Sequence, residues 1–154
     1  MILYLDASGL IKLYVAEQGS GPARQAVKDA AATYAVDASY LAVRTALVEG
    51  ARMGLLTEKA AKRARDDFET DWQAIHVVVP DQALLRLAGD IAETHAVAAS
   101  VALNVASMQK IREQIGACAI RFIGYHRTQA LATKLMLVEK SGPPTTSTTR
   151  SLRA

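Results

Sequence analysis

The stretch ILYLDASGLIKLY at residues 2–14 decides the fold class. Its apolar run ends on Asp6, and Ser8 then opens a segment whose apolar residues recur at helical spacing. This order predicts a buried strand over 2–6, followed by a helix over 8–17 that Ser8 caps. Asp6 would then lie at the carboxyl end of a buried strand, where ligands bind in parallel α/β sheets.

The same alternation of strand and helix patterns continues through the chain. Further strands are expected near 34–36, 75–79 and 118–123. Further helices are expected over 22–32, 37–53, 57–72, 81–94, 98–114 and 127–137, with Asp37 or Ser39 and then Thr57 as caps of the third and fourth helices of the chain. Alternating strands and helices predict a three-layer α/β fold, with a short parallel sheet of about four strands flanked by helices.

Length and composition limit the classes of protein that the chain can be. With 154 residues, 51% of them hydrophobic, it can bury the core of one domain. The lone Cys118 excludes an internal disulfide and a cysteine-based zinc site, and we expect it to pack as a small hydrophobic residue within a strand. No leader follows Met1 and no apolar stretch reaches about 20 residues, so we expect a cytoplasmic protein without a membrane partner. The net charge of +3 is compatible with a polyanionic partner.

The last part of the chain differs in composition from the rest. Residues 141–151 read SGPPTTSTTRS, which is polar and turn-prone. Such a segment buries too little apolar surface to fold alone. We therefore expect one domain over 1–138 and a flexible tail over 139–154.

A series of short motifs follows the opening stretch. They are LYLDASGLIKLY at 3–14, YLAVRTAL at 40–47 with GLLT at 54–57, VVPD at 78–81 with AGDIA at 88–92, ALNVAS at 102–107, and RFIGYHR at 121–127. In this order and spacing they resemble the PIN-domain family, and specifically the VapC-type ribonuclease toxins of type II toxin–antitoxin systems. The resemblance covers residues 1–138. It implies a PIN-like fold, metal-dependent endoribonuclease activity with Mg²⁺ or Mn²⁺, a VapB-like antitoxin as partner, and a homodimer.

The resemblance also implies a cluster of acids around the metal, and here the cluster is degenerate. Asp6 matches the first acid, and Ser8 matches the hydroxyl that orients it. Ala42, Val101 and His126 stand where the remaining acids are expected. Because Mg²⁺ prefers oxygen ligands and several carboxylates fix its position, Asp6 nearly alone would bind the metal weakly or not at all.

Three other residues are candidates to compensate for the missing acids or to contact the substrate. Glu49 lies seven residues after Ala42, on nearly the same helical face but about 10 Å further along. His126 could be a ligand for Mn²⁺ or Zn²⁺, or an ordinary surface histidine. Asn104 could bind a phosphate oxygen or a water molecule, or make a plain polar contact.

Two functions from different classes remain open on the sequence, together with a third option, an unrelated phosphate chemistry built on Asp6 and His126. The first is a magnesium-dependent endoribonuclease whose activity is impaired by the missing acids. The alternative is a catalytically inactive binding module that holds RNA or an antitoxin.

Overall fold

The computed structural model describes residues 1–116, 118–135 and 137–138. The tail expected over 139–154 lies outside the described residues. Within them the strands are β1 (Ile2–Leu5), β2 (Ala32–Val36), β3 (His76–Val78) and β4 (Ile120–Ile123). The helices are α1 (Ala7–Tyr14), α2 (Ser20–Asp29), α3 (Ala38–Arg52), α4 (Glu58–Trp72), α5 (Gln82–His95), α6 (Ala99–Ile115) and α7 (His126–Lys134).

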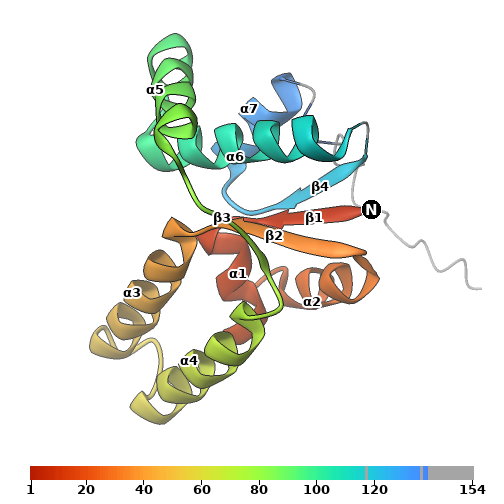
Figure 1. Ribbon diagram of the computed structural model, residues 1–154. Coiled ribbons are helices and arrows are strands. Elements are labelled where there is room, and N and C mark those ends of the chain that lie inside the picture. Colours follow the sequence, from red (N-terminus) through yellow and green to blue (C-terminus); the bar gives the residue numbers. More distant parts are fainter. Residues whose placement is uncertain (117, 136, 139–154) are drawn as a thin grey trace, which may run out of the picture.

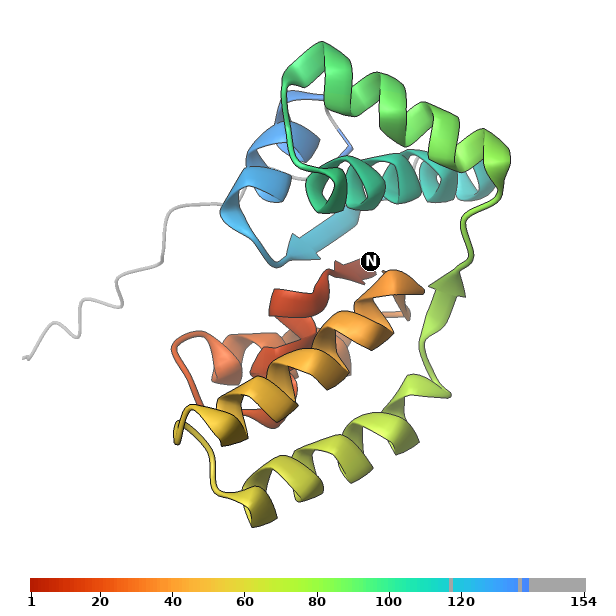
Figure 2. The same ribbon diagram turned by 90° about the vertical axis from the view of Figure 1, so that its left-hand side faces the viewer.

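The strands form one parallel sheet in the order β3-β2-β1-β4. Helices α1 to α4 cover one face of the sheet, and α5, α6 and α7 cover the other (Figures 1 and 2). The prediction of a three-layer α/β fold with a short parallel sheet of four strands is therefore confirmed within the described residues. None of the helices described there has the length and apolar character that crossing a bilayer requires.

Strand β1 is the centre of the core because it is buried on both faces. Ile2 and Tyr4 pack into the cluster beneath α5, α6 and α7, whereas Leu3 and Leu5 pack into the cluster on the opposite face. All four are at most 8% exposed. A parallel strand covered on both sides has no solvated face, so its sequence reads as a continuous apolar run.

The strand order places a crevice beside the end of β1. The chain proceeds from β1 through β2 to β3 on one side, and then returns to pair β4 with the other side of β1. The connections that leave β1 and β4 therefore diverge to opposite faces, which opens a crevice at the carboxyl ends of these two strands. Asp6 follows β1 and Tyr125 follows β4 at this crevice.

The caps expected from the sequence are correct in part. Thr57 caps α4, because its Oγ1 accepts a hydrogen bond from the backbone N–H of Ala60 at 3.0 Å. Ser8 does not cap the first helix: Asp6 does, and α1 begins at Ala7 and ends at Tyr14 instead of spanning 8–17. Asp37 precedes α3, but its side chain accepts no capping bond.

Two further expectations fail near the end of the described chain. Cys118 is exposed and lies before β4, which begins at Ile120, so it is not a packed strand residue. The helix expected over 127–137 is shorter, because α7 ends at Lys134. In both places an apolar run extends beyond the residues whose backbone takes part in the strand or helix.

Candidate functional site

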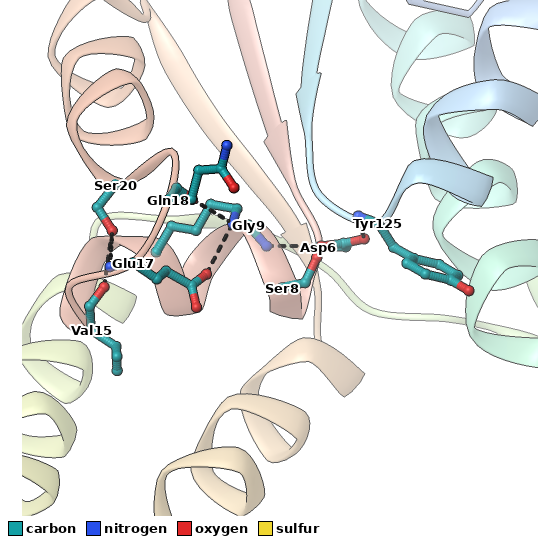
Figure 3. Close-up of polar contacts among 9 residues, drawn as sticks. Asp6, Ser8, Gly9, Val15, Glu17, Gln18, Ser20 and Tyr125 are labelled. Carbon is teal, nitrogen blue, oxygen red and sulfur yellow. Dashed lines mark hydrogen bonds and ion pairs between the residues drawn. The ribbon is translucent and has the colours of Figure 1, made fainter. Parts of the chain in front are cut away.

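The carboxylate of Asp6 is buried and accepts three hydrogen bonds (Figure 3). Its Oδ1 accepts from the Ser8 hydroxyl at 2.8 Å and from the Gly9 backbone N–H at 2.9 Å. Its Oδ2 accepts from the Tyr125 backbone N–H at 2.7 Å. Asp6 therefore caps α1 and also ties the start of that helix to the chain that follows β4.

Two glycines allow this close approach of α1 to the turn after β4. A side-chain carbon on Gly9 would overlap the carbonyl group of Ile123, and one on Gly124 would overlap the Asp6 carboxyl group. Neither glycine has a positive φ, so close approach, rather than backbone conformation, requires them. The Asp6 carboxylate is thus enclosed on the side that faces the turn.

A cavity of about 320 Å³ opens beside Asp6. Its walls come from the ends of β1 and β2, from the residues that open α1, α3 and α7, and from the first two turns of α6. Among the described residues that line it, Asp6 is the only carboxylate. The lining also includes the hydroxyl residues Ser8, Ser39, Ser100 and Thr128, and the apolar residues Val36, Ala42 and Leu103.

The positions that the resemblance assigns to the missing acids do not converge on this cavity. Ala42 lines it from α3. Val101 is 1% exposed and packs in the core beneath α6. His126 opens α7, is exposed, and lies outside the described lining, with its ring against that of Tyr125 at a centroid distance of 4.5 Å.

The candidate compensating acid also stays outside the cavity. Glu49 is exposed near the end of α3, two helical turns beyond Ala42, and is not among the described residues that line the cavity. A substitute for the second acid would have to come from the first two turns of α3, where Ala38, Ser39 and Ala42 face the cavity.

Asn104 lines the cavity but is engaged with the protein itself. Its Oδ1 accepts a hydrogen bond from the Tyr4 hydroxyl at 2.9 Å, and its Nδ2 donates to the Ser100 carbonyl at 2.8 Å. Burial, with a smaller contribution from the charge of Asp6, raises the pKa of Tyr4 far above its usual range. Tyr4 therefore remains a protonated donor that joins β1 to α6. Sequence reasoning missed this pair, although a tyrosine inside a buried strand needs a hydrogen-bond partner.

Two further residues of the lining were missed as site residues. The sequence pattern marks Ser39 only as a candidate helix cap and does not single out Thr128. They are 3% and 1% exposed, and neither makes a hydrogen bond within the described part of the chain. The signal that could have found them is a hydroxyl residue in the first turn of a helix that follows a strand.

The donor set does not fit Mg²⁺ or Mn²⁺. These hard cations need several oxygen ligands, and the described lining offers one carboxylate, already bonded to three donors. In the described residues there is also no group of three or more His, Cys, Asp or Glu side chains placed to hold a metal ion.

Comparison with known proteins identifies relatives of the chain. No family model matches it. Two curated relatives do match: ribonuclease VapC45 of Mycobacterium tuberculosis strain CDC 1551 / Oshkosh and ribonuclease VapC49 of Mycobacterium tuberculosis strain H37Rv. Each is 33% identical to this chain over 106 residues, which are 69% of this chain and 74% of the relative. With this identity and coverage, the chain belongs to the VapC family.

Proposed function

We propose that this VapC-family protein keeps the fold and the pocket of a toxin but has lost metal-dependent cleavage of RNA, so that it acts by binding. One observation carries the proposal. Asp6, the only carboxylate among the described residues that line the cavity, already accepts three hydrogen bonds from the protein. A metal ion would have to compete with these donors for the carboxylate and would gain no second acid.

The chemistry of metal-assisted hydrolysis supports this proposal. The metal must be fixed firmly enough to lower the pKa of a bound water and to stabilise charge on the phosphoryl oxygens. Of the three replaced positions, only Ala42 lines the cavity, and alanine offers no ligand. Val101 is apolar and enclosed, and His126 is exposed beside Tyr125. We also propose that residues 1–138 form one PIN-like domain with a degenerate site.

A second candidate function is residual metal-dependent endoribonuclease activity. It is favoured by the names of the two relatives, both ribonucleases, and by the retention of Asp6 with a hydroxyl at Ser8 that donates to it. In this case Asp6 would be the residue on which any activity depends.

The partner proposed for the binding function is a VapB-like antitoxin, with the protein itself as a homodimer. Large apolar side chains exposed on α3 and in the turn to α4 support a protein partner, since patches of this kind mark interaction surfaces. They are Leu41, Val48, Met53 and Leu55, each more than 60% exposed.

RNA cleavage separates the two candidate functions. Native protein and the Asp6→Asn variant are incubated with RNA and Mg²⁺ or Mn²⁺. We expect no metal-dependent cleavage by the native chain, and no rise in its melting temperature when the metal is added, because only a site with ligands couples binding to stability. Metal-dependent cleavage by the native chain that Asp6→Asn abolishes would show that the binding proposal is wrong.

A further inference from the structure

The lining of the cavity carries two hydroxyl groups that have no partner among the described residues. Ser39 and Thr128 are each at least 97% buried and line the cavity. Every fully enclosed side-chain nitrogen or oxygen in the described residues has a hydrogen-bond partner, whereas these two hydroxyls have none. Both hydroxyl oxygens are therefore not fully enclosed, and the cavity is the space that their residues line. Buried polar groups are normally hydrogen-bonded, so this pair points to a bound ligand.

The first turns of four helices meet at the same cavity. Ser8 of α1, Ser39 of α3, Ser100 of α6 and Thr128 of α7 all line it. The side chain of Asp6 caps α1, whereas α3, α6 and α7 have no side-chain cap. Their first backbone N–H groups have no acceptor within the helix, and such groups bind anions.

The charge of the cavity follows from these helices and from the missing acids. Each helix N-terminus carries roughly half a positive elementary charge, so the four together contribute about two, and Asp6 offsets about one of these. Of the three replaced positions only Ala42 lines the cavity, so a carboxylate there would offset a second positive charge and favour a cation. With alanine at position 42, about one net positive charge remains for an anion.

The geometry points to a metal-free binding site for a phosphate group, held by the Ser39 and Thr128 hydroxyls and by the N-termini of α3 and α7. This inference rests on the proposed function, because a bound Mg²⁺ would require the acids that are missing. It names the ligand of the binding module: a phosphomonoester, either a free nucleotide or the phosphorylated end of an RNA strand.

The remaining lining fits an organic group attached to the phosphate. At about 320 Å³ the cavity is larger than a phosphate ion alone. Val36, Ala42 and Leu103 supply an apolar wall, against which the nucleoside part of a nucleotide can pack. Adenosine monophosphate is therefore a suitable probe beside inorganic phosphate.

The site is tested by isothermal titration calorimetry of the full chain with inorganic phosphate and with adenosine monophosphate. Both titrations contain EDTA, which removes divalent metal ions. We expect both probes to bind, and Ser39→Ala or Thr128→Val to weaken nucleotide binding about tenfold, the usual effect of removing one hydrogen bond to a charged group. Thr94→Val is the matched control, because Thr94 is exposed on α5 and outside the described lining. This variant should bind like the native chain.

A negative charge introduced at position 42 tests whether the cavity binds an anion. Ala42 is exposed and lines the cavity, so a longer side chain is tolerated there. Ala42→Glu should abolish binding of both probes, whereas Ala42→Gln, which has the same shape without the charge, should retain it. Absence of binding by the native chain at millimolar probe, or equal weakening by Glu and Gln, would overturn the inference.

Binding of two RNA oligonucleotides that differ only in a 5′-phosphate shows whether the bound phosphate belongs to RNA or to a free nucleotide. Tighter binding of the phosphorylated strand than of the nucleotide assigns the site to RNA ends, and the reverse assigns it to free nucleotides. Equal binding of both strands, without competition by phosphate, contradicts a phosphomonoester site. A native chain that binds no phosphate and cleaves no RNA would remove this inference alone and leave the proposed function standing, because cleavage is a separate measurement.

Discussion

The lining of the cavity holds two sets of polar groups that are used differently. Both carboxylate oxygens of Asp6 accept hydrogen bonds, from Ser8, Gly9 and Tyr125, which lie on both sides of the crevice. The hydroxyls of Ser39 and Thr128 have no hydrogen-bond partner among the described residues. Asp6 thus holds the two sides of the crevice together, whereas these two hydroxyls retain free hydrogen-bonding capacity.

The largest effect on stability is expected at Gly124, which packs directly against the Asp6 carboxyl group. Gly124→Ala should lower the free energy of unfolding by about 4 kcal/mol, because the new methyl group overlaps the Asp6 carboxyl and disrupts its bonds. Urea denaturation measures this change. Gly89→Ala is the matched control: Gly89 is a glycine of α5 with open space around it, so alanine should stabilise by up to about 1 kcal/mol. If both substitutions changed the free energy of unfolding equally, the close approach of Gly124 to the Asp6 carboxyl group would not matter for stability.

Removal of the carboxylate itself should have the next largest effect. Asp6→Ala should destabilise the fold by about 3 kcal/mol, because α1 loses its cap and the Tyr125 N–H loses its acceptor. Asp81→Ala provides the comparison, since Asp81 caps α5 from an exposed position, and its loss should cost only about 1 kcal/mol. If Asp6→Ala is neutral or stabilising, Asp6 is not a structural group.

The hydrogen bond beneath the cavity should contribute less. Tyr4→Phe should destabilise by about 1–2 kcal/mol, because the Oδ1 of Asn104 loses its buried donor. The melting temperature measures the change. The double variant Tyr4→Phe, Asn104→Leu removes both partners and should recover part of the lost stability. If the loss came only from the smaller volume of phenylalanine, the double variant would recover none of it.

Alkaline pH should weaken the fold gradually. Burial raises the pKa of Tyr4, and burial with the nearby Asp71 raises the pKa of Tyr14, so both phenols stay protonated in the folded chain. In the unfolded chain they ionise near pH 10. The unfolded state then binds fewer protons, so this stability is complete below about pH 10 and falls as the pH rises further. Urea denaturation at pH 9 and 11 tests this, and Tyr4→Phe should reduce the difference.

The smallest effect on stability is expected for the two hydroxyls that have no partner among the described residues. Ser39→Ala and Thr128→Val should each change the free energy of unfolding by less than about 0.5 kcal/mol, because neither hydroxyl has a partner in the described chain to lose. Thermal unfolding without ligand measures this. A loss of stability as large as that of Asp6→Ala would mean that these hydroxyls, like Asp6, hold the fold together.

The fold was predictable because its signals are local. The apolar run of β1 and the alternation of strand and helix patterns are consequences of burial on both faces of a parallel sheet. Boundaries were less predictable: Ser8 and Asp37 both look like caps, and only the position of the backbone N–H groups made Asp6 the cap of α1.

The candidate site was predictable only in its location. The sequence placed Asp6 at the end of the first strand and showed that Ala42 is not an acid. It could not show that Val101 would be enclosed or that His126 would be exposed, because these depend on how α6 and α7 pack. Thr128 became a site residue only because the first turns of α7 and α3 line the same cavity.

By itself the sequence determined the layer order, the place of the crevice and the absence of acids at the positions that the resemblance assigns to them, since each follows from residue types along one strand or helix. The tertiary structure alone decided that Asp6 is bonded to Tyr125, 119 residues away, and that Ser39 and Thr128 share one cavity. The physical reason is that hydrogen bonds and cavities depend on distances between elements that are remote in sequence. Local patterns fix the elements, and packing fixes those distances.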